Sequence, residues 1–187
     1  RRFRKTQTAA KLPRRYDKHW LTLTPEKVKA QLDAGETQTI RLNMPNDGIL
    51  EHHDLVRGVV TFQYRTIDDS VLLKSDGFPT YHLAVVVDDH AMEITHVIRA
   101  EEWLPSVPKH LFLYQCFGWE APIFAHLPWI LGADKSKLSK RHGAVSALQY
   151  RDQGYLPEAL QNFFILMGWH PKGDDEVKTR DQVMAEF

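Results

Sequence analysis

The feature that most constrains the fold is a series of apolar runs between residues 83 and 131. Three of these runs are predicted to be strands: residues 83–90, 93–103 and 121–131. Residues 106–118 separate the last two and show a helical spacing of apolar side chains that ends at Gly118. Unbroken apolar strands alternating with a helix are typical of a parallel sheet buried on both faces. We therefore expect an α/β fold that binds ligands beyond the carboxyl ends of its strands.

The segments on either side follow other patterns. Residues 21–36 are predicted to be a helix, because Thr24 can cap it and Pro25 suits its first position. Residues 37–76 contain β-rich runs broken by turn residues, which favours a small antiparallel sheet. A helical stripe near the end of the chain is expected to face the core, and it comprises Leu156, Ala159, Leu160, Phe163, Phe164 and Met167.

A basic loop, "DKSKLSKRHG", occupies residues 134–143 and directly follows the third apolar run. Its cations repel one another unless an anion or solvent separates them, and Lys137 and Lys140 are spaced to flank one phosphate. The Gly-rich spacing of a P-loop is absent. From the residues alone, phosphate binding, contact with a nucleic-acid backbone and a solvated turn all remain open.

Charged residues also end the first two apolar runs. Asp88 and Asp89 could bind a metal or a ribose, or could cap a following helix. Arg99 could grip a carboxylate through two hydrogen bonds, or could pair with Glu101 or Glu102.

Composition excludes several classes of protein. The chain has 24 basic and 24 acidic residues, so it is not polybasic as a whole, although its first 20 residues hold eight basic groups and one acid. Cys116 is the single cysteine, which excludes an internal disulfide and a cysteine-based zinc cluster. No apolar run approaches the roughly 20 residues that span a bilayer. We expect a cytoplasmic protein that does not associate with a membrane and has no zinc site in this portion.

The order of these features resembles one family. Residues 137–141, "KLSKR", are similar to the second signature of class I aminoacyl-tRNA synthetases, and residues 76–144 resemble the second half of the catalytic domain of bacterial-type glutamyl-tRNA synthetases. The flanking stretches "DDSVLLKSDGFPTYHLA" and "GYLPEALQNFFILMGW" fit as well, so that the resemblance extends over about residues 40–169.

The resemblance implies three domains. Residues 1–76 would end an inserted α+β domain that grips the tRNA acceptor stem, and residues 77–143 would be the second half of a Rossmann-like nucleotide-binding domain. Residues 144–187 would begin a helical stem-contact domain. The first class I signature, His-Ile-Gly-His or similar, does not occur in these 187 residues. We therefore expect an internal portion of a larger enzyme that is inactive alone and exposes an apolar sheet edge.

The resemblance also implies roles for individual residues. Lys137, Ser139 and Lys140 would be catalytic and stabilise the phosphates in the transition state. ATP would contact Glu102, Ile130, Lys137, Lys140 and Arg141. The glutamate site would comprise Tyr81, His82, Arg99 and Trp103.

The implied activity is ligation of glutamate to tRNA through glutamyl-adenylate. Its partners would be ATP with its associated Mg²⁺, L-glutamate and tRNA(Glu), and the parent enzyme would be a monomer. The alternatives are a tRNA-binding module without catalysis, and the relative that glutamylates a modified base in tRNA (the glutamyl-queuosine type). The run of residues 145–169 argues against that relative, and the stretches around Asp88 and Arg99 argue against a glutaminyl-tRNA synthetase.

Overall fold

The chain forms two compact units. The computed structural model describes residues 16–131, 135–137, 146–171 and 173–187. The first unit comprises Arg1–Ile98 and Glu102–His126, and the second comprises Arg99–Glu101 and Leu127–Phe187. The two units are defined by contacts within the chain. They are not the three domains expected from the resemblance, whose boundaries at residues 76 and 143 remain predictions.

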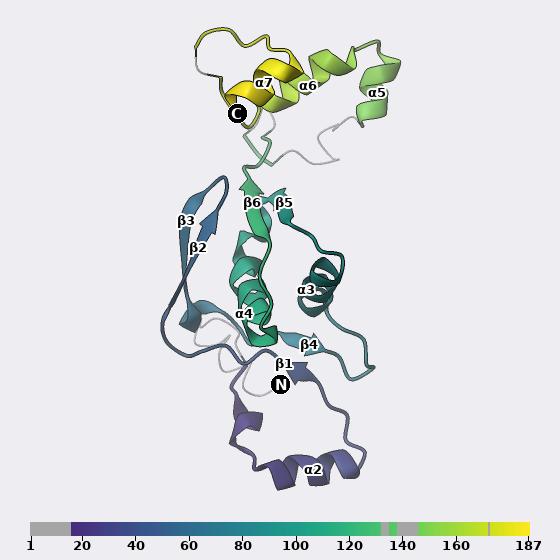
Figure 1. Ribbon diagram of the computed structural model, residues 1–187. Helices are drawn as coiled ribbons and strands as arrows, with labels where there is room; N and C mark the ends of the chain where they lie inside the picture. The colour runs from purple at the N-terminus through teal and green to yellow at the C-terminus, as the bar shows by residue number, and fades with distance from the viewer. Residues whose placement is uncertain (1–15, 132–134, 138–145, 172) are drawn as a thin grey trace. The chain divides into compact units, whose positions relative to one another are not determined.

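A strand–helix–strand segment supplies the predicted α/β element. Strand β5 (His96–Ala100) leads through a 3-10 helix (Glu101–Ser106) into α4 (Val107–Phe117), and β6 (Ile123–Leu127) follows. The two strands form one sheet and run in the same direction (Figure 1). Gly118 ends α4 with a φ of 70°, a conformation that glycine adopts without strain. The two strands and the helix are therefore confirmed.

The prediction of a strand at residues 83–90 is wrong, because this segment lies in helix α3 (Tyr81–Ala91). Three consecutive valines favour a strand locally, but tertiary packing overrides that preference. Leu83 and Val86, three residues apart, pack into the core on one face of α3. Asp88 and Asp89 therefore lie in the last turns of a helix, and do not follow a strand as a cap.

The antiparallel pairing predicted for residues 37–76 is present, but it forms two separate two-stranded sheets and not the single sheet expected. Strands β1 (Ile40–Arg41) and β4 (Val71–Leu73) pair with each other, and β2 (Ile49–Asp54) and β3 (Gly58–Gln63) form a hairpin. A short 3-10 helix (Tyr64–Thr66) follows β3.

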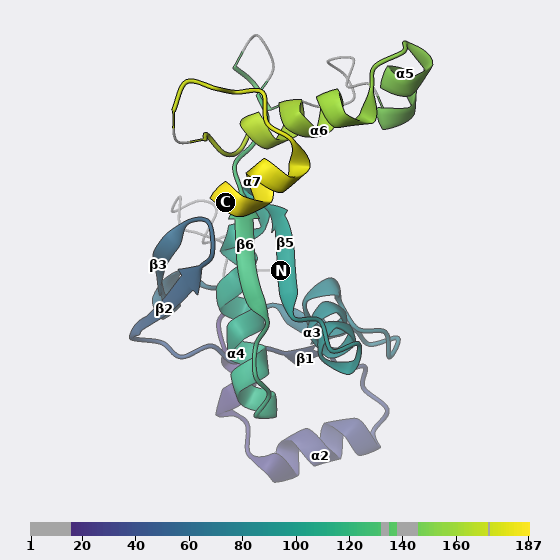
Figure 2. The same cartoon turned by 45° about the horizontal axis from the view of Figure 1, so that its top comes forward.

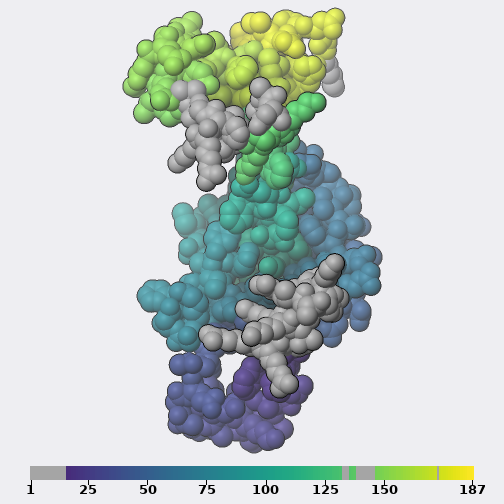
Figure 3. Space-filling model, turned by 180° about the vertical axis from the view of Figure 1, so that it is seen from behind, coloured from purple at the N-terminus to yellow at the C-terminus, as the bar shows by residue number. Residues whose placement is uncertain are grey.

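The predicted first helix is present as α2 (Pro25–Asp33), with Pro25 in its first position. A 3-10 helix (His19–Thr22) precedes it. Residues 16 to about 40, purple to dark blue in Figure 3, lie together at one end of the first unit. The apolar side chains of Val28 and Leu32 remain partly exposed there.

One hydrophobic core joins α3 and α4 to the antiparallel region. Its buried members come from four parts of the sequence: Leu42, Met44, Ile67, Leu72, Val86, Leu113 and Tyr114. The views of Figures 1 and 2 agree that α3 lies beside α4. Because both helices rest on the same core, the residues at their first turns are held in fixed positions.

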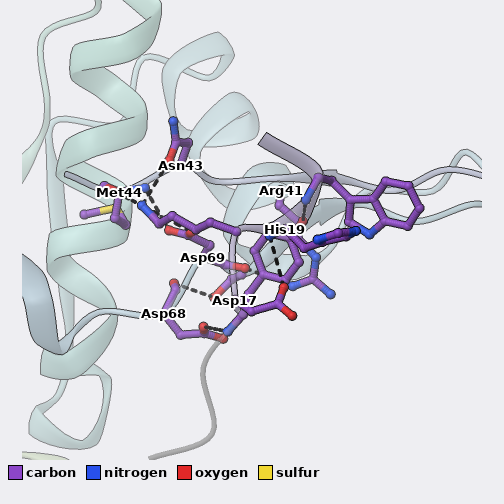
Figure 4. A network of polar contacts seen from close by, with 11 residues as sticks. Asp17, His19, Arg41, Asn43, Met44, Asp68 and Asp69 are labelled. Carbon is purple, nitrogen blue, oxygen red and sulfur yellow. Dashed lines mark hydrogen bonds and ion pairs between the residues drawn. The ribbon is translucent and has the colours of Figure 1, made fainter. Parts of the chain in front are cut away.

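A polar network fastens the first described residues to this core (Figure 4). The ammonium group of Lys18 donates to the Met44 carbonyl at 2.7 Å and to Asn43 Oδ1 at 3.1 Å. It also lies 3.5 Å from the buried carboxylate of Asp69. The Tyr16 amide donates to Asp68 at 2.8 Å. Residues 16–18 are thereby tied to two segments more than 20 positions away.

A second buried polar contact joins the hairpin to β6. The Asp54 carboxylate accepts the backbone N–H groups of Val56, Arg57 and His126 as well as the His126 ring. The Leu55 amide adds a backbone bond to the Phe124 carbonyl at 2.8 Å. The turn of the hairpin is therefore fixed against the last strand of the α/β segment.

The second unit contains the helices α5 (Ala147–Asp152), α6 (Pro157–Leu166) and α7 (Arg180–Glu186). The helix predicted near the end of the chain is confirmed as α6. Its stripe is not core as expected, because Phe163 is 56% exposed and Phe164 is 46% exposed. The packing of α6 against α7 leaves the two phenylalanine side chains uncovered among the described residues. None of the helices that the structure describes is long and apolar enough to cross a membrane.

Candidate active site

Three aromatic side chains predicted to line a ligand site lie together in the first unit. Tyr81 and His82 occupy the first turn of α3, and Trp103 lies on the 3-10 helix after β5. The ring centroids of Tyr81 and Trp103 are 5.1 Å apart, and those of Tyr81 and His82 are 5.7 Å apart. Tyr81 and Trp103 are both partly exposed. The cluster presents flat apolar walls with polar tips, which suits a small polar ligand that has an aliphatic stem.

His110 contacts two members of this cluster, His82 and Tyr81, from helix α4. It was not predicted from the sequence. It is buried on α4, and its Nε2 lies 3.0 Å from Nδ1 of His82. Its ring also lies 6.1 Å from the Tyr81 ring. Because one of the two facing nitrogens must donate and the other accept, the contact couples the tautomers of the two rings. His110 shares the apolar face of α4 with Val107 and Tyr114, and a histidine on such a face is a signal that could have revealed it.

The start of α3 is anchored by Thr80. Its hydroxyl donates to the Val71 carbonyl at 2.7 Å, and its amide donates to the Leu72 carbonyl at the same distance. Both acceptors lie on β4. Tyr81 and His82 follow directly, so their backbone positions are set by the antiparallel region and the core.

The remaining predicted contacts in the described chain lie within β5 or in the segments that follow β5 and β6. Arg99 is the fourth residue of β5 and is partly buried, whereas Glu102 is exposed at the start of the following 3-10 helix. In the second unit, Glu101 accepts the Trp129 amide at 3.2 Å. This contact joins the segments that follow β5 and β6 in that unit.

The beginning of the basic loop is described, and its centre is not. Ile130 is half exposed. The ammonium group of Lys137 lies 5.7 Å from the centroid of the Trp129 ring, within the range of a cation–π contact. Lys137 also forms an isolated antiparallel bridge with Leu131. Ser139, Lys140 and Arg141 lie outside the described residues, and so do the first seven basic residues of the chain.

Among residues 16–131, 135–137, 146–171 and 173–187, no three His, Cys, Asp or Glu side chains are grouped so that they could hold a metal ion. In the first unit, the aromatic cluster at the start of α3 is suited to a small polar ligand. In the second unit, the ammonium group of Lys137 is suited to an anion.

The strand–helix–strand segment and the matched sequence define a class of protein. The profile of the family "tRNA synthetases class I (E and Q), catalytic domain" matches residues 1–187, so the chain belongs to this family.

Within the family, the chain is similar to glutamate–tRNA ligases. It is 50% identical over 184 residues to the glutamate–tRNA ligase of Alkaliphilus metalliredigens, covering 98% of this chain and 37% of that protein. It is 50% identical over 187 residues to that of Treponema pallidum, covering all of this chain and 35% of the relative. The crystal structure of the glutamate–tRNA synthetase of Elizabethkingia anophelis matches with a TM-score of 0.83 and 39% identity, over all of this chain and 43% of that one. The chain thus spans little more than a third of the length of the curated relatives it matches.

Proposed function

We propose that this chain carries the amino-acid-recognition and phosphate-stabilising parts of the catalytic site of a glutamate–tRNA ligase. The observation that carries the proposal is the convergence of Tyr81 and His82 of helix α3 with Trp103 of the 3-10 helix that follows β5. Support comes from family membership and from relatives that are named glutamate–tRNA ligases at about half identity.

The proposed reaction has two steps. The α-carboxylate of glutamate attacks the α-phosphorus of ATP, a new oxygen–phosphorus bond forms, and pyrophosphate leaves. A ribose hydroxyl at the 3′ end of tRNA(Glu) then attacks the activated carbonyl, and AMP leaves. Mg²⁺ enters as the counter-ion of the ATP phosphates and belongs to the substrate.

Each predicted residue has a role in the first step. Arg99 would bind the side-chain carboxylate of glutamate through two charge-assisted hydrogen bonds, and Tyr81, His82 and Trp103 would enclose its aliphatic part. Lys137 and Lys140 would stabilise the charge that develops on the phosphates, which is the main contribution a protein makes to phosphoryl transfer. Ser139 would hold the loop, and Glu102, Ile130 and Arg141 would contact the nucleotide.

A chimaera gives the most direct test. The 184 matching residues of the Alkaliphilus enzyme would be replaced by those of this chain, and glutamate-dependent exchange of pyrophosphate into ATP would be measured. We expect activity in the chimaera and none in the 187-residue chain alone. A folded chimaera without exchange activity would refute the proposal.

Lys140→Ala in the chimaera separates catalysis from RNA binding. If Lys140 stabilises the phosphates, its loss should lower the exchange rate by about 10²–10³-fold and leave the affinity for tRNA nearly unchanged. If Lys140 only contacts the RNA backbone, its loss should lower the affinity for tRNA and the dependence of that affinity on salt, with little effect on exchange. The second result would favour a tRNA-binding module.

A further inference from the structure

The chain contains two Asp–Gly sequences, Asp47–Gly48 and Asp76–Gly77. Such a sequence can rearrange without an enzyme, because glycine has no side chain to shield its amide nitrogen from the preceding carboxyl group. The nitrogen attacks the side-chain carboxyl carbon, a cyclic imide forms, and water leaves. Hydrolysis of the imide can then give an isoaspartate, through whose side chain the backbone runs. The surroundings of the two sequences differ, and the difference decides which of them can react.

The second sequence is closed into a turn. Asp76 accepts the Phe78 amide at 3.0 Å through one carboxylate oxygen and the Lys74 ammonium group at 3.1 Å through the other. The Gly77 amide donates to the Lys74 carbonyl at 3.0 Å. The bond from the Phe78 amide, followed by that from Lys74, lowers the pKa of Asp76. Both reacting groups are therefore occupied, and an ionised carboxylate has no hydroxyl group to lose.

The first sequence is open. Asp47 and Gly48 are exposed. Neither the Asp47 carboxylate nor the Gly48 amide makes a hydrogen bond or an ion pair with any residue that the structure describes. Residues 45–47 make no backbone hydrogen bond with those residues either. An exposed backbone with few contacts opens at low cost, so the Asp47 carboxyl can approach the Gly48 nitrogen without breaking a bond.

The fold itself requires the glycine of this sequence. Gly48 has a φ of 107°, a conformation that residues with a side chain rarely adopt. Its carbonyl accepts the Tyr64 amide at 3.1 Å, and a Cβ atom at this position would lie 3.3 Å from the Tyr64 ring. A larger residue would strain the entry to β2. The turn that leads into the hairpin therefore depends on the same residue that leaves the amide nitrogen unshielded.

We propose that Asp47 is a site of spontaneous isomerisation to isoaspartate in the folded protein. The Gly48 nitrogen gives up its proton and forms a bond to the side-chain carboxyl carbon, which loses its hydroxyl group, so that one water leaves. Water then adds to the backbone carbonyl carbon of Asp47 and the original peptide bond breaks, which frees an α-carboxylate. The product has one additional carbon in the backbone directly before β2. The reaction is independent of the proposed ligase activity.

The test is incubation of the 187-residue chain, and in parallel of the chimaera, in H₂¹⁸O at neutral pH. Each passage through the imide adds one ¹⁸O atom. Digestion with trypsin in ordinary water then gives peptides 42–57 and 75–99, which contain the two sequences, and fragmentation in the mass spectrometer locates the label and the isoaspartate.

We expect the label to enter residue 47 at least about tenfold faster than residue 76. Several hydrogen bonds must break before residue 76 can react, and each should slow the reaction about fivefold. Equal labelling of the two residues, or no label at residue 47, would overturn the proposal. Neither outcome depends on whether the chimaera is an active ligase.

A denatured sample and two variants show whether the fold causes the difference. In guanidinium chloride the two sequences should react at similar rates. Lys74→Met removes one bond to Asp76 and should raise the rate at residue 76 about fivefold, with residue 47 unchanged. Asp47→Glu should abolish the label at residue 47, because glutamate must close a larger ring. A difference that persists in denaturant would contradict the role of the fold, and so would label that remains in Asp47→Glu.

Discussion

The Nδ1 atom of His126 lies 2.5 Å from a carboxylate oxygen of Asp54, although 72 positions separate the two residues. Both side chains are almost completely buried. Burial alone would raise the pKa of Asp54, but hydrogen bonds from the His126 ring and from three backbone N–H groups outweigh it and lower the pKa to about 2. Asp54 is therefore ionised at neutral pH, and Nδ1 of His126 must carry the donated proton. The pair joins the β2–β3 hairpin to β6.

Asp54→Asn should lower the free energy of unfolding by about 3 kcal/mol, because breaking one side of a buried pair leaves the other without its partner. Denaturant unfolding followed by circular dichroism measures the change. The control is His53→Gln on the same strand, whose side chain is 77% exposed and should change stability by less than about 0.5 kcal/mol. Equal stability of the two variants would mean that the pair does not hold the hairpin.

The buried His52 predicts that stability falls in mild acid. Burial lowers the pKa of His52 below its usual 6.5, against the opposing effect of Asp54. The unfolded chain therefore binds more protons than the folded chain below pH 6.5, and the free energy of unfolding should decrease as the pH falls from 7 to 5. Asp54 adds little in this window, because its contribution is complete above pH 3.8 and is lost only as the pH falls toward 2.

His52→Leu should flatten this dependence, because it removes the titrating ring and a buried Nε2 atom that has no hydrogen-bond partner among the described residues. Denaturant midpoints at pH 7 and pH 5 measure the slope. His53→Gln should keep the slope of the parent chain. A variant His52→Leu with an unchanged slope would assign the acid sensitivity to another group.

His110 is expected to position His82 in the proposed glutamate site. In the chimaera, His110→Phe fills the space but cannot bond to His82, and we expect the KM for glutamate to rise about tenfold with kcat nearly unchanged. His110→Gln can restore a hydrogen bond and should recover most of the affinity. Steady-state pyrophosphate exchange at varied glutamate and varied ATP measures both effects. An equal rise in the KM for ATP would show that the substitution disturbs the fold generally.

Lys18 should contribute more to stability than an exposed ion pair does. Lys18→Met removes the bonds to Asn43 and Met44 and leaves the buried Asp69 without its cation, which should cost about 1–3 kcal/mol. Lys29→Met breaks the exposed pair with Asp33 at 2.6 Å and should cost less than about 1 kcal/mol. Denaturant unfolding compares the two, and limited proteolysis should show earlier cleavage near residue 18 only in Lys18→Met. Similar losses in both would contradict the role of the network.

Local signals in the sequence determined several elements of this protein. Helical spacing and Gly118 defined α4, Pro25 marked the start of α2, and the apolar runs around residues 96–100 and 123–127 gave the two strands. The choice of Tyr81, His82 and Trp103 as neighbours came from the resemblance to a family, and the structure brings the three side chains together.

Only the tertiary structure decided the rest. Val85, Val86 and Val87 favour a strand by themselves, and packing against α4 makes the segment a helix. His110 meets His82 across 28 positions, and Asp54 meets His126 across 72. No periodicity within a short window records such pairs, because their partners are chosen by how whole helices and strands pack. The sequence determined the ends of elements such as α2 and α4, and packing decided that α3 is a helix and which polar groups were buried together.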